Sequence, residues 1–150
     1  MHTLDIITVL VTGLMVGNEL TVSLFINPVM RQLDGPAQAR SLSLFARLLG
    51  RTMPIWYAIC LLLLIAETVL RRSEPAFLPL LAATILWVGI IVFTITTLVP
   101  INNRIAALSV TTPLSQWIGE HRRWDSLHRL RILCLFVAVV LLTHALLPTK

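Results

Sequence analysis

Four long stretches of the chain carry almost no formal charge, and this pattern limits its possible folds more than any other feature. They cover residues 5–31, 51–71, 74–104 and 131–150. The charged residues inside them are Glu19 in the first and Glu67 in the second. Roughly 20 helical residues cross a hydrocarbon core about 30 Å thick. We therefore predict four transmembrane helices, at about residues 4–26, 54–71, 76–99 and 130–148.

The overall composition supports this prediction. Of the 150 residues, 57% are hydrophobic and 13% are charged, and the mean hydropathy is +0.86. A water-soluble domain of this length cannot bury so much apolar surface. The apolar runs are continuous rather than alternating, which favours helices over a β-barrel. The sequence thus predicts an all-α integral membrane protein that forms one four-helix bundle over residues 1–150.

Prolines lie near most of the predicted helix ends. They are Pro28, Pro54, Pro75, Pro100 and Pro148. Because proline lacks a backbone N–H, it is tolerated best close to the end of a helix. We therefore expect the spans to begin or end near these residues.

Basic residues are distributed unevenly between the connections. Connections rich in Lys and Arg usually stay in the cytoplasm. Nine of the twelve fall in the two longer connections, so we expect both termini on the non-cytoplasmic side of an inner or plasma membrane. The net charge of +5 is interpreted in this way and not as a nucleic-acid-binding surface. The nine are Arg31, Arg40, Arg47, Arg51, Arg104, Arg122, Arg123, Arg129 and Arg131; the other three are Arg71, Arg72 and Lys150.

Both cytoplasmic connections have an amphipathic pattern. In residues 36–50, basic side chains repeat on one face, whereas Leu42, Phe45 and Leu49 share another. This pattern predicts an interfacial helix, or an N-terminal extension of the second span that is kinked at Pro54. A second interfacial helix is predicted over residues 113–131.

Glu19 is the most informative polar residue because it lies inside the first predicted span. It is about 15 residues, or roughly 22 Å, from the start of that helix and nearer to its cytoplasmic end. A carboxylate at this depth is costly and usually faces the interior of the bundle. It is either a structural acid bound to a neighbouring helix or a functional acid, base or ligand.

Two more groups of polar residues lie near the cytoplasmic ends of the third and fourth spans. Asn102 and Asn103 are suited either to cap a helix or to donate hydrogen bonds to a ligand carbonyl. Trp124, His128 and Arg131 have i, i+4, i+7 spacing and so share one helix face. That face suits an anionic or phenolic ring, although it is also typical of a membrane anchor. We predict that these residues meet the buried acid of the first span in one polar pocket.

The opposite side carries a different set of polar residues. His2, Asp5, Glu67 and His144 are types that bind divalent metals, but they are scattered over three helices and a terminus. We therefore predict no metal site. The chain also has no CxxCH motif and no paired intramembrane histidines, so no cofactor is expected.

Three sequence elements are similar to those of a known family. They are Asn18 with Pro28, the Pro-Ile-Asn element at residues 100–102, and the Trp-Asp-Ser-Leu-His-Arg-Leu-Arg element at residues 124–131. Together they resemble the anthrone oxygenase-like family of small integral membrane proteins over nearly the whole chain. The resemblance implies a four-helix membrane bundle that converts anthrones to anthraquinones with dioxygen, without added flavin or haem. It also implies that Asn102 and the three residues of the Trp/His/Arg face line the site.

The sequence thus predicts a membrane oxidoreductase or oxygenase that acts on a small lipid-soluble aromatic, anthrone- or quinol-like. His128 or Glu19 removes a proton, Arg131 stabilises the anion, and the asparagines orient the carbonyl while Trp124 stacks on the ring. The alternative is a non-catalytic membrane protein, either a small proton-coupled transporter or a helper subunit. Four short helices enclose little volume, which makes a homodimer plausible.

Overall fold

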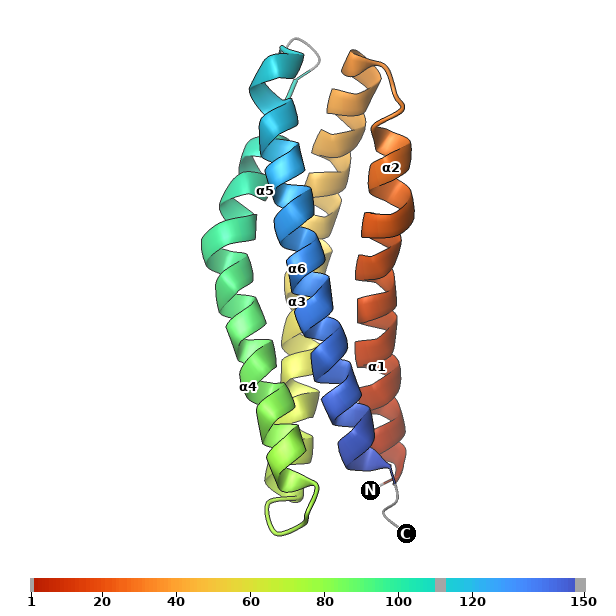
Figure 1. Cartoon of the computed structure of the whole chain (residues 1–150), viewed down its shortest axis with the longest axis vertical. Coiled ribbons are helices and arrows are strands. Elements are labelled where there is room, and N and C mark those ends of the chain that lie inside the picture. The colour runs from red at the N-terminus through yellow and green to blue at the C-terminus, as the bar shows by residue number, and fades with distance from the viewer. Residues whose placement is uncertain (1, 110–112, 148–150) are drawn as a thin grey trace.

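The computed structural model describes residues 2–109 and 113–147, and these residues are almost entirely helical (Figure 1). Four helices are long and apolar enough to cross a membrane, and no strand occurs in the described ranges. The predicted all-α four-helix bundle is therefore confirmed. The four helices cover His2–Met30, Gly35–Leu70, Phe77–Ala106 and Trp117–Leu146.

Two of the four helices are interrupted by a short π-helical segment. The first consists of α1 (His2–Thr21), η1 (Val22–Ile26) and α2 (Asn27–Met30). The second is α3 (Gly35–Leu70). The third consists of α4 (Phe77–Phe93), η2 (Thr94–Leu98) and α5 (Val99–Ala106). The fourth is α6 (Leu114–Leu146).

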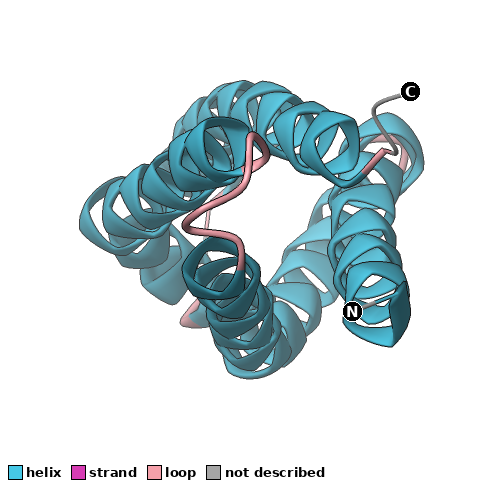
Figure 2. Ribbon diagram, turned by 90° about the horizontal axis from the view of Figure 1, so that it is seen from below, coloured by secondary structure: helices cyan, strands magenta, loops and turns pink. Residues whose placement is uncertain are grey.

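The helices follow one another around the bundle. Helix α1 packs against α3 and α6, and α4 packs against the same two helices. Figure 2 shows this arrangement seen nearly end-on. Neighbouring helices run in opposite directions, so α1 begins and α6 ends at the same end of the molecule (Figure 1).

The π-helical segments explain why two prolines lie inside long helices. Pro28 follows η1 and Pro100 follows η2. A proline ring crowds the carbonyl four residues before it, and a wider π-turn in that region makes room for the ring. Pro54 also lies inside a helix, α3. Pro28 lies two residues before the end of the first helix at Met30, as expected, whereas the helices continue well beyond Pro54 and Pro100. Pro148 is outside the described residues.

The segments predicted as interfacial helices are helical but not separate. Residues 36–50 form the first part of α3, as in the second of the two expectations, and residues 114–131 form the first part of α6. Helix α3 has 36 residues and is thus about 54 Å long. Its early turns remain in the bundle because Leu42 and Ala46 pack against Ile101, Ile105 and Trp117. The described helices therefore extend beyond the predicted spans, and residue 148 of the fourth span is not described.

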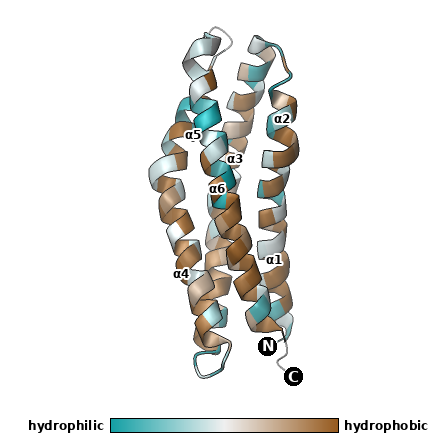
Figure 3. Cartoon of the chain, in the orientation of Figure 1, coloured by the Kyte–Doolittle hydropathy of each residue, from teal (hydrophilic) through white to brown (hydrophobic). Residues whose placement is uncertain are grey.

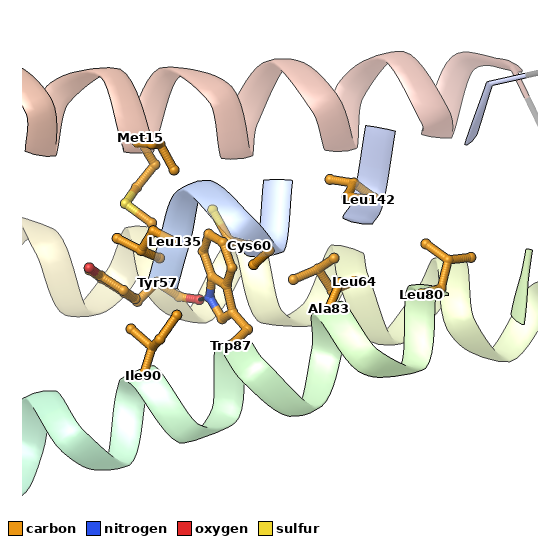
Figure 4. Packing of buried hydrophobic residues seen from close by; sticks show 12 residues of the cluster. Met15, Tyr57, Cys60, Leu64, Leu80, Ala83, Trp87, Ile90, Leu135 and Leu142 are labelled. Atoms are coloured by element: carbon orange, nitrogen blue, oxygen red, sulfur yellow. Dashed lines mark hydrogen bonds between the residues drawn. The ribbon is translucent and has the colours of Figure 1, made fainter. Parts of the chain in front are cut away.

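The bundle has an apolar core in its middle and polar clusters toward its ends. Met15, Leu64, Leu80, Trp87 and Leu135 are completely buried in this core (Figure 4). The outer faces are also apolar, as lipid-facing surfaces must be. Figure 3 shows hydrophilic residues gathered in the upper half of α6, at the end away from the chain termini. The exposed outer side chains include Leu14, Leu62, Ile85 and Leu133.

Candidate functional site

An ion pair between α1 and α6 forms the centre of the polar cluster in the half of the bundle away from the chain termini, which we call the polar half. Arg131 Nη2 donates to Glu19 Oε2 at 2.8 Å, and both residues are buried, with 7% and 3% of their surface exposed. The hydroxyl of Tyr57 in α3 donates to Glu19 Oε1 at 2.9 Å. Both carboxylate oxygens therefore accept a hydrogen bond, as an ionised carboxylate requires. The guanidinium carbon of Arg131 lies 5.5 Å from the centre of the Tyr57 ring, which adds a cation–π contact.

His128 lies behind this ion pair and is completely buried. Its Nδ1 lies 2.9 Å from Arg131 Nη2, and its Nε2 lies 3.2 Å from the backbone oxygen of Glu19. Arginine can only donate and a carbonyl can only accept. Nδ1 is therefore the acceptor and Nε2 carries the proton, so the imidazole is neutral. Nδ1 also lies 3.3 Å from Glu19 Oε2, but no proton is left to bridge these two atoms.

Trp124 continues the site one turn earlier in α6. Its ring stacks on the His128 ring, with centroids 4.6 Å apart and an angle of 15° between the planes. His121 lies on the other side at 6.4 Å and 11°. The i, i+4 spacing predicted from the sequence therefore produces a stack of rings along one helix face.

A cavity of about 410 Å³ adjoins the ion pair. Helix α3 forms one wall, and the α4–η2–α5 helix forms the other. The polar residues that line the cavity are Glu19, Tyr57, Thr94, Asn102, Asn103 and Arg131. The other lining residues are apolar apart from Gly50, and Trp124 contributes an aromatic surface.

Five of the six candidate residues from the sequence line this cavity. His128 is the exception, because it contacts Glu19 and Arg131 from behind. Asn102 Nδ2 donates to the backbone oxygen of Ala46 at 3.0 Å, a contact between α5 and α3 rather than a cap. The side chain of Asn103 is exposed at the edge of the cavity.

Arg131 keeps hydrogen-bonding capacity that its partners do not use. Nη2 donates its two protons to Glu19 and His128. Nη1 makes only a long contact of 3.5 Å with Thr94 Oγ1. The buried Nε has no partner among the described residues. A buried unpaired donor is unfavourable.

A second cluster braces the segment that carries these residues. Asp125 Oδ1 accepts a hydrogen bond of 2.7 Å from Asn27, and its Oδ2 lies 3.1 Å from Arg31 and 2.9 Å from Arg129. Asp125 is buried, with 4% of its surface exposed. It therefore holds α6 against α2 next to Trp124.

Tyr57 and Thr94 are site residues that the sequence analysis missed. Tyr57 is the single tyrosine of the chain and lies in an otherwise apolar run. Figure 4 shows its hydroxyl directed away from Leu64 and Leu80. A polar hydroxyl in a predicted span is a usable signal, because it needs a partner when it is buried.

Another buried acid lies at the end of the bundle where the chain begins. Glu67, with 1% of its surface exposed, accepts hydrogen bonds from Thr8 at 3.2 Å and from Arg71 at 3.2 Å. Arg71 also binds Asp5 at 2.6 Å and Glu74 at 3.1 Å. Two of the residues considered as metal ligands, Asp5 and Glu67, are thus partners of an arginine.

The fold and the site together define a class of protein. It is a small helical bundle, apolar enough to lie in a membrane, with an Arg–Glu pair buried beside a ligand-sized cavity in one half. A family model described as anthrone oxygenase matches residues 42–141 of the 150, and the chain belongs to the anthrone oxygenase family. The matched region contains Tyr57, Asn102 and the residues of α6 that form the site, but not Glu19. No curated protein and no solved structure matches the chain.

Proposed function

We propose that the protein is an oxygenase that binds a flat, lipid-soluble aromatic ketone or phenol, anthrone- or quinol-like, and assists its reaction with dioxygen. The observation that carries the proposal is the Glu19–Arg131 pair, 2.8 Å apart, on the wall of an otherwise mostly apolar cavity. The cavity volume of about 410 Å³ lies in the range of about 300–1,000 Å³ that is usual for small-molecule sites.

Glu19 is the better placed of the two candidate bases. It lines the cavity, whereas His128 does not, and the free electron pair of His128 Nδ1 is taken by Arg131. We therefore assign proton removal to Glu19. His128 acts as a positioning residue that holds the guanidinium and the backbone of Glu19.

Arg131 makes this proton transfer favourable in a low-dielectric site. When the proton moves from the substrate to Glu19, the negative charge moves to the substrate oxygen, and the same guanidinium stays beside it. The net charge of the cavity does not change, so little charge has to be resolvated. Nη1 of Arg131, whose contact with Thr94 Oγ1 is long at 3.5 Å, offers a further donor to the new anion. Asn102 and Asn103 are placed to orient the ketone oxygen, and Trp124 to stack on the rings.

The chemistry balances with dioxygen as the only oxidant. Removal of a proton from the methylene group next to the aromatic rings gives an enolate. Its carbon forms a bond to dioxygen, and protonation gives a hydroperoxide. Loss of the second proton from that carbon, with cleavage of the O–O bond and release of water, leaves a second ketone. The methylene carbon is oxidised by four electrons, and one oxygen atom ends in the product and the other in water.

Oxygen consumption with anthrone as the substrate tests this proposal. Purified protein in lipid nanodiscs should consume dioxygen in the presence of anthrone, and Glu19→Gln should abolish the consumption. Glu67→Gln is the matched control, because Glu67 is equally buried and paired with an arginine, but at the opposite end. Equal rates in the wild-type, Glu19→Gln and protein-free samples would refute the proposal.

The alternative of a small proton-coupled transporter makes a different prediction for the same variant. In that case Glu19→Gln would abolish proton-coupled uptake into liposomes, and no oxygen would be consumed by the wild-type protein. A helper subunit would show neither activity without its partner.

Orientation, cofactor content and oligomeric state are part of the same proposal. From the distribution of Arg and Lys residues, we propose that the polar half faces the cytoplasm and that both termini face the other side of an inner or plasma membrane. Cysteine labelling of the termini in intact cells tests this orientation. Elemental analysis and an absorption spectrum of the purified protein test the cofactor-free reaction, and light scattering in detergent tests a homodimer.

A further inference from the structure

The cavity lies at a place where two neighbouring helices do not close on each other. Helix α3 packs against α4 on one side of η2 and against α5 on the other, whereas η2 makes no comparable contact with it. The residues that line the cavity at this level come from both sides of the gap, for example Ala58 in α3 and Ile95 in η2. The gap between α3 and η2 is therefore an opening between the two walls of the cavity.

The edges of this gap are exposed on the outer surface of the bundle. Pro54 and Ala58 are exposed on the α3 edge, and Ile95 and Val99, at 60% and 37%, on the other. The exposed apolar neighbours of these residues are Ile55, Ile59 and Leu62 on α3 and Val92 on α4. The exposed polar neighbours are Arg51, Thr52 and Thr96. The larger part of the surface around the gap is thus apolar, as a surface in contact with hydrocarbon requires, and Arg51 and Asn103 lie on its polar side.

The shape of the third helix accounts for the gap. A π-turn widens the helix at η2, and Pro100 removes a backbone donor immediately after it. Figure 1 shows the α4–η2–α5 helix bowed outward in its upper half. The side chain at position 58 is only a methyl group, so the facing edge of α3 does not fill the space.

We propose that the gap between α3 and η2 is a lateral portal through which a flat aromatic ketone passes from the bilayer into the cavity. The class of ligand rests on the proposed function, but the route rests on the exposed edges alone. Such a ligand dissolves in hydrocarbon, and this route spares it a passage through water. The Glu19–Arg131 pair lies on the inner side of the portal, where the polar end of the ligand would meet it.

Photolabelling with benzophenone tests the portal without any turnover. Benzophenone is a lipid-soluble aromatic ketone that inserts into C–H bonds on illumination, preferentially at methionine. Met53 lines the cavity, and its sulfur lies 3.6 Å from Asn18 Nδ2 in α1, on the inner side of the bundle. In nanodiscs containing benzophenone, peptide mapping should show Met53 labelled, together with lipid-facing residues such as Leu62.

Three variants separate the portal from the rest of the lipid-facing surface. Ala58→Phe narrows one edge of the gap and should lower the labelling of Met53 severalfold, with Leu62 unchanged. Ile95→Trp does the same from the opposite edge, so the test does not depend on the folding of one variant. Ile59→Phe is the matched control, because Ile59 is the next residue, equally lipid-facing and absent from the cavity wall. It should leave both labels unchanged.

The outcome for the portal is distinguishable from the outcome for catalysis. Met53 labelling that is undiminished in both Ala58→Phe and Ile95→Trp, or lowered equally by Ile59→Phe, would overturn the portal. Labelling that follows the predicted pattern in a protein that consumes no oxygen would support the portal and remove the proposed reaction.

Discussion

The buried pair of Glu19 and Arg131 leads to a prediction about stability that does not depend on any substrate. Their side chains are only 3% and 8% exposed, so each charge relies on the other for its stabilisation. Removing one partner of such a buried pair typically costs about 3–5 kcal/mol, whereas replacing both by neutral groups is often close to neutral. We therefore expect Glu19→Gln and Arg131→Met each to lose about 3–5 kcal/mol of unfolding free energy, and the double variant to lose much less than the sum.

Reversible unfolding in mixed micelles with increasing denaturing detergent, followed by circular dichroism, measures these differences. The cycle consists of the wild type, the two single variants and the double variant. Additive losses in the double variant would show that the two side chains do not act as a pair.

Three further predictions concern the surroundings of the pair. Tyr57→Phe removes only the 2.9 Å hydrogen bond to Glu19 and should cost about 1 kcal/mol in the same assay, with a lowered oxygenation rate. Gly50→Ala places a Cβ 3.2 Å from Asn102 Nδ2, so it should displace that amide and raise the KM for anthrone with little change in stability. Asp125→Ala should cost only about 1–2 kcal/mol, because the two arginines that it binds are 40% and 58% exposed and can be hydrated instead; the same unfolding assay measures this.

The general architecture was predictable because the membrane environment leaves few alternatives. In lipid, the backbone N–H and C=O groups of a long continuous apolar run must form their hydrogen bonds within that run, which favours helices. The four apolar helices agree with this expectation. The prolines were a weaker guide, since a proline indicates a helix end only where the backbone cannot widen. Upstream of Pro100 the backbone widens into a π-turn, and the helix continues to Ala106.

The candidate site was predictable where one helix determines the spacing. Trp124, His128 and Arg131 lie on one face because they follow the helical period. The partner of Arg131 followed from the cost of an acid in a membrane span. The roles within the cluster depend on contacts between helices, which spacing does not encode. The buried position of His128 behind the pair and the hydroxyl of Tyr57 in front of it are of this kind.

The apolar core in the middle of the bundle has a consequence for how the protein exchanges charge with its surroundings. Met15, Leu64 and Leu135 lie between the layer of Glu19 and the layer of Glu67, and the buried polar residues between the layers, such as Thr12, are not ionisable. No ionisable side chain among these core residues connects the two acids, so we expect a proton taken up at Glu19 to leave by the end at which it arrived. We therefore expect turnover to move no net charge across the bilayer and to be indifferent to a voltage applied across it.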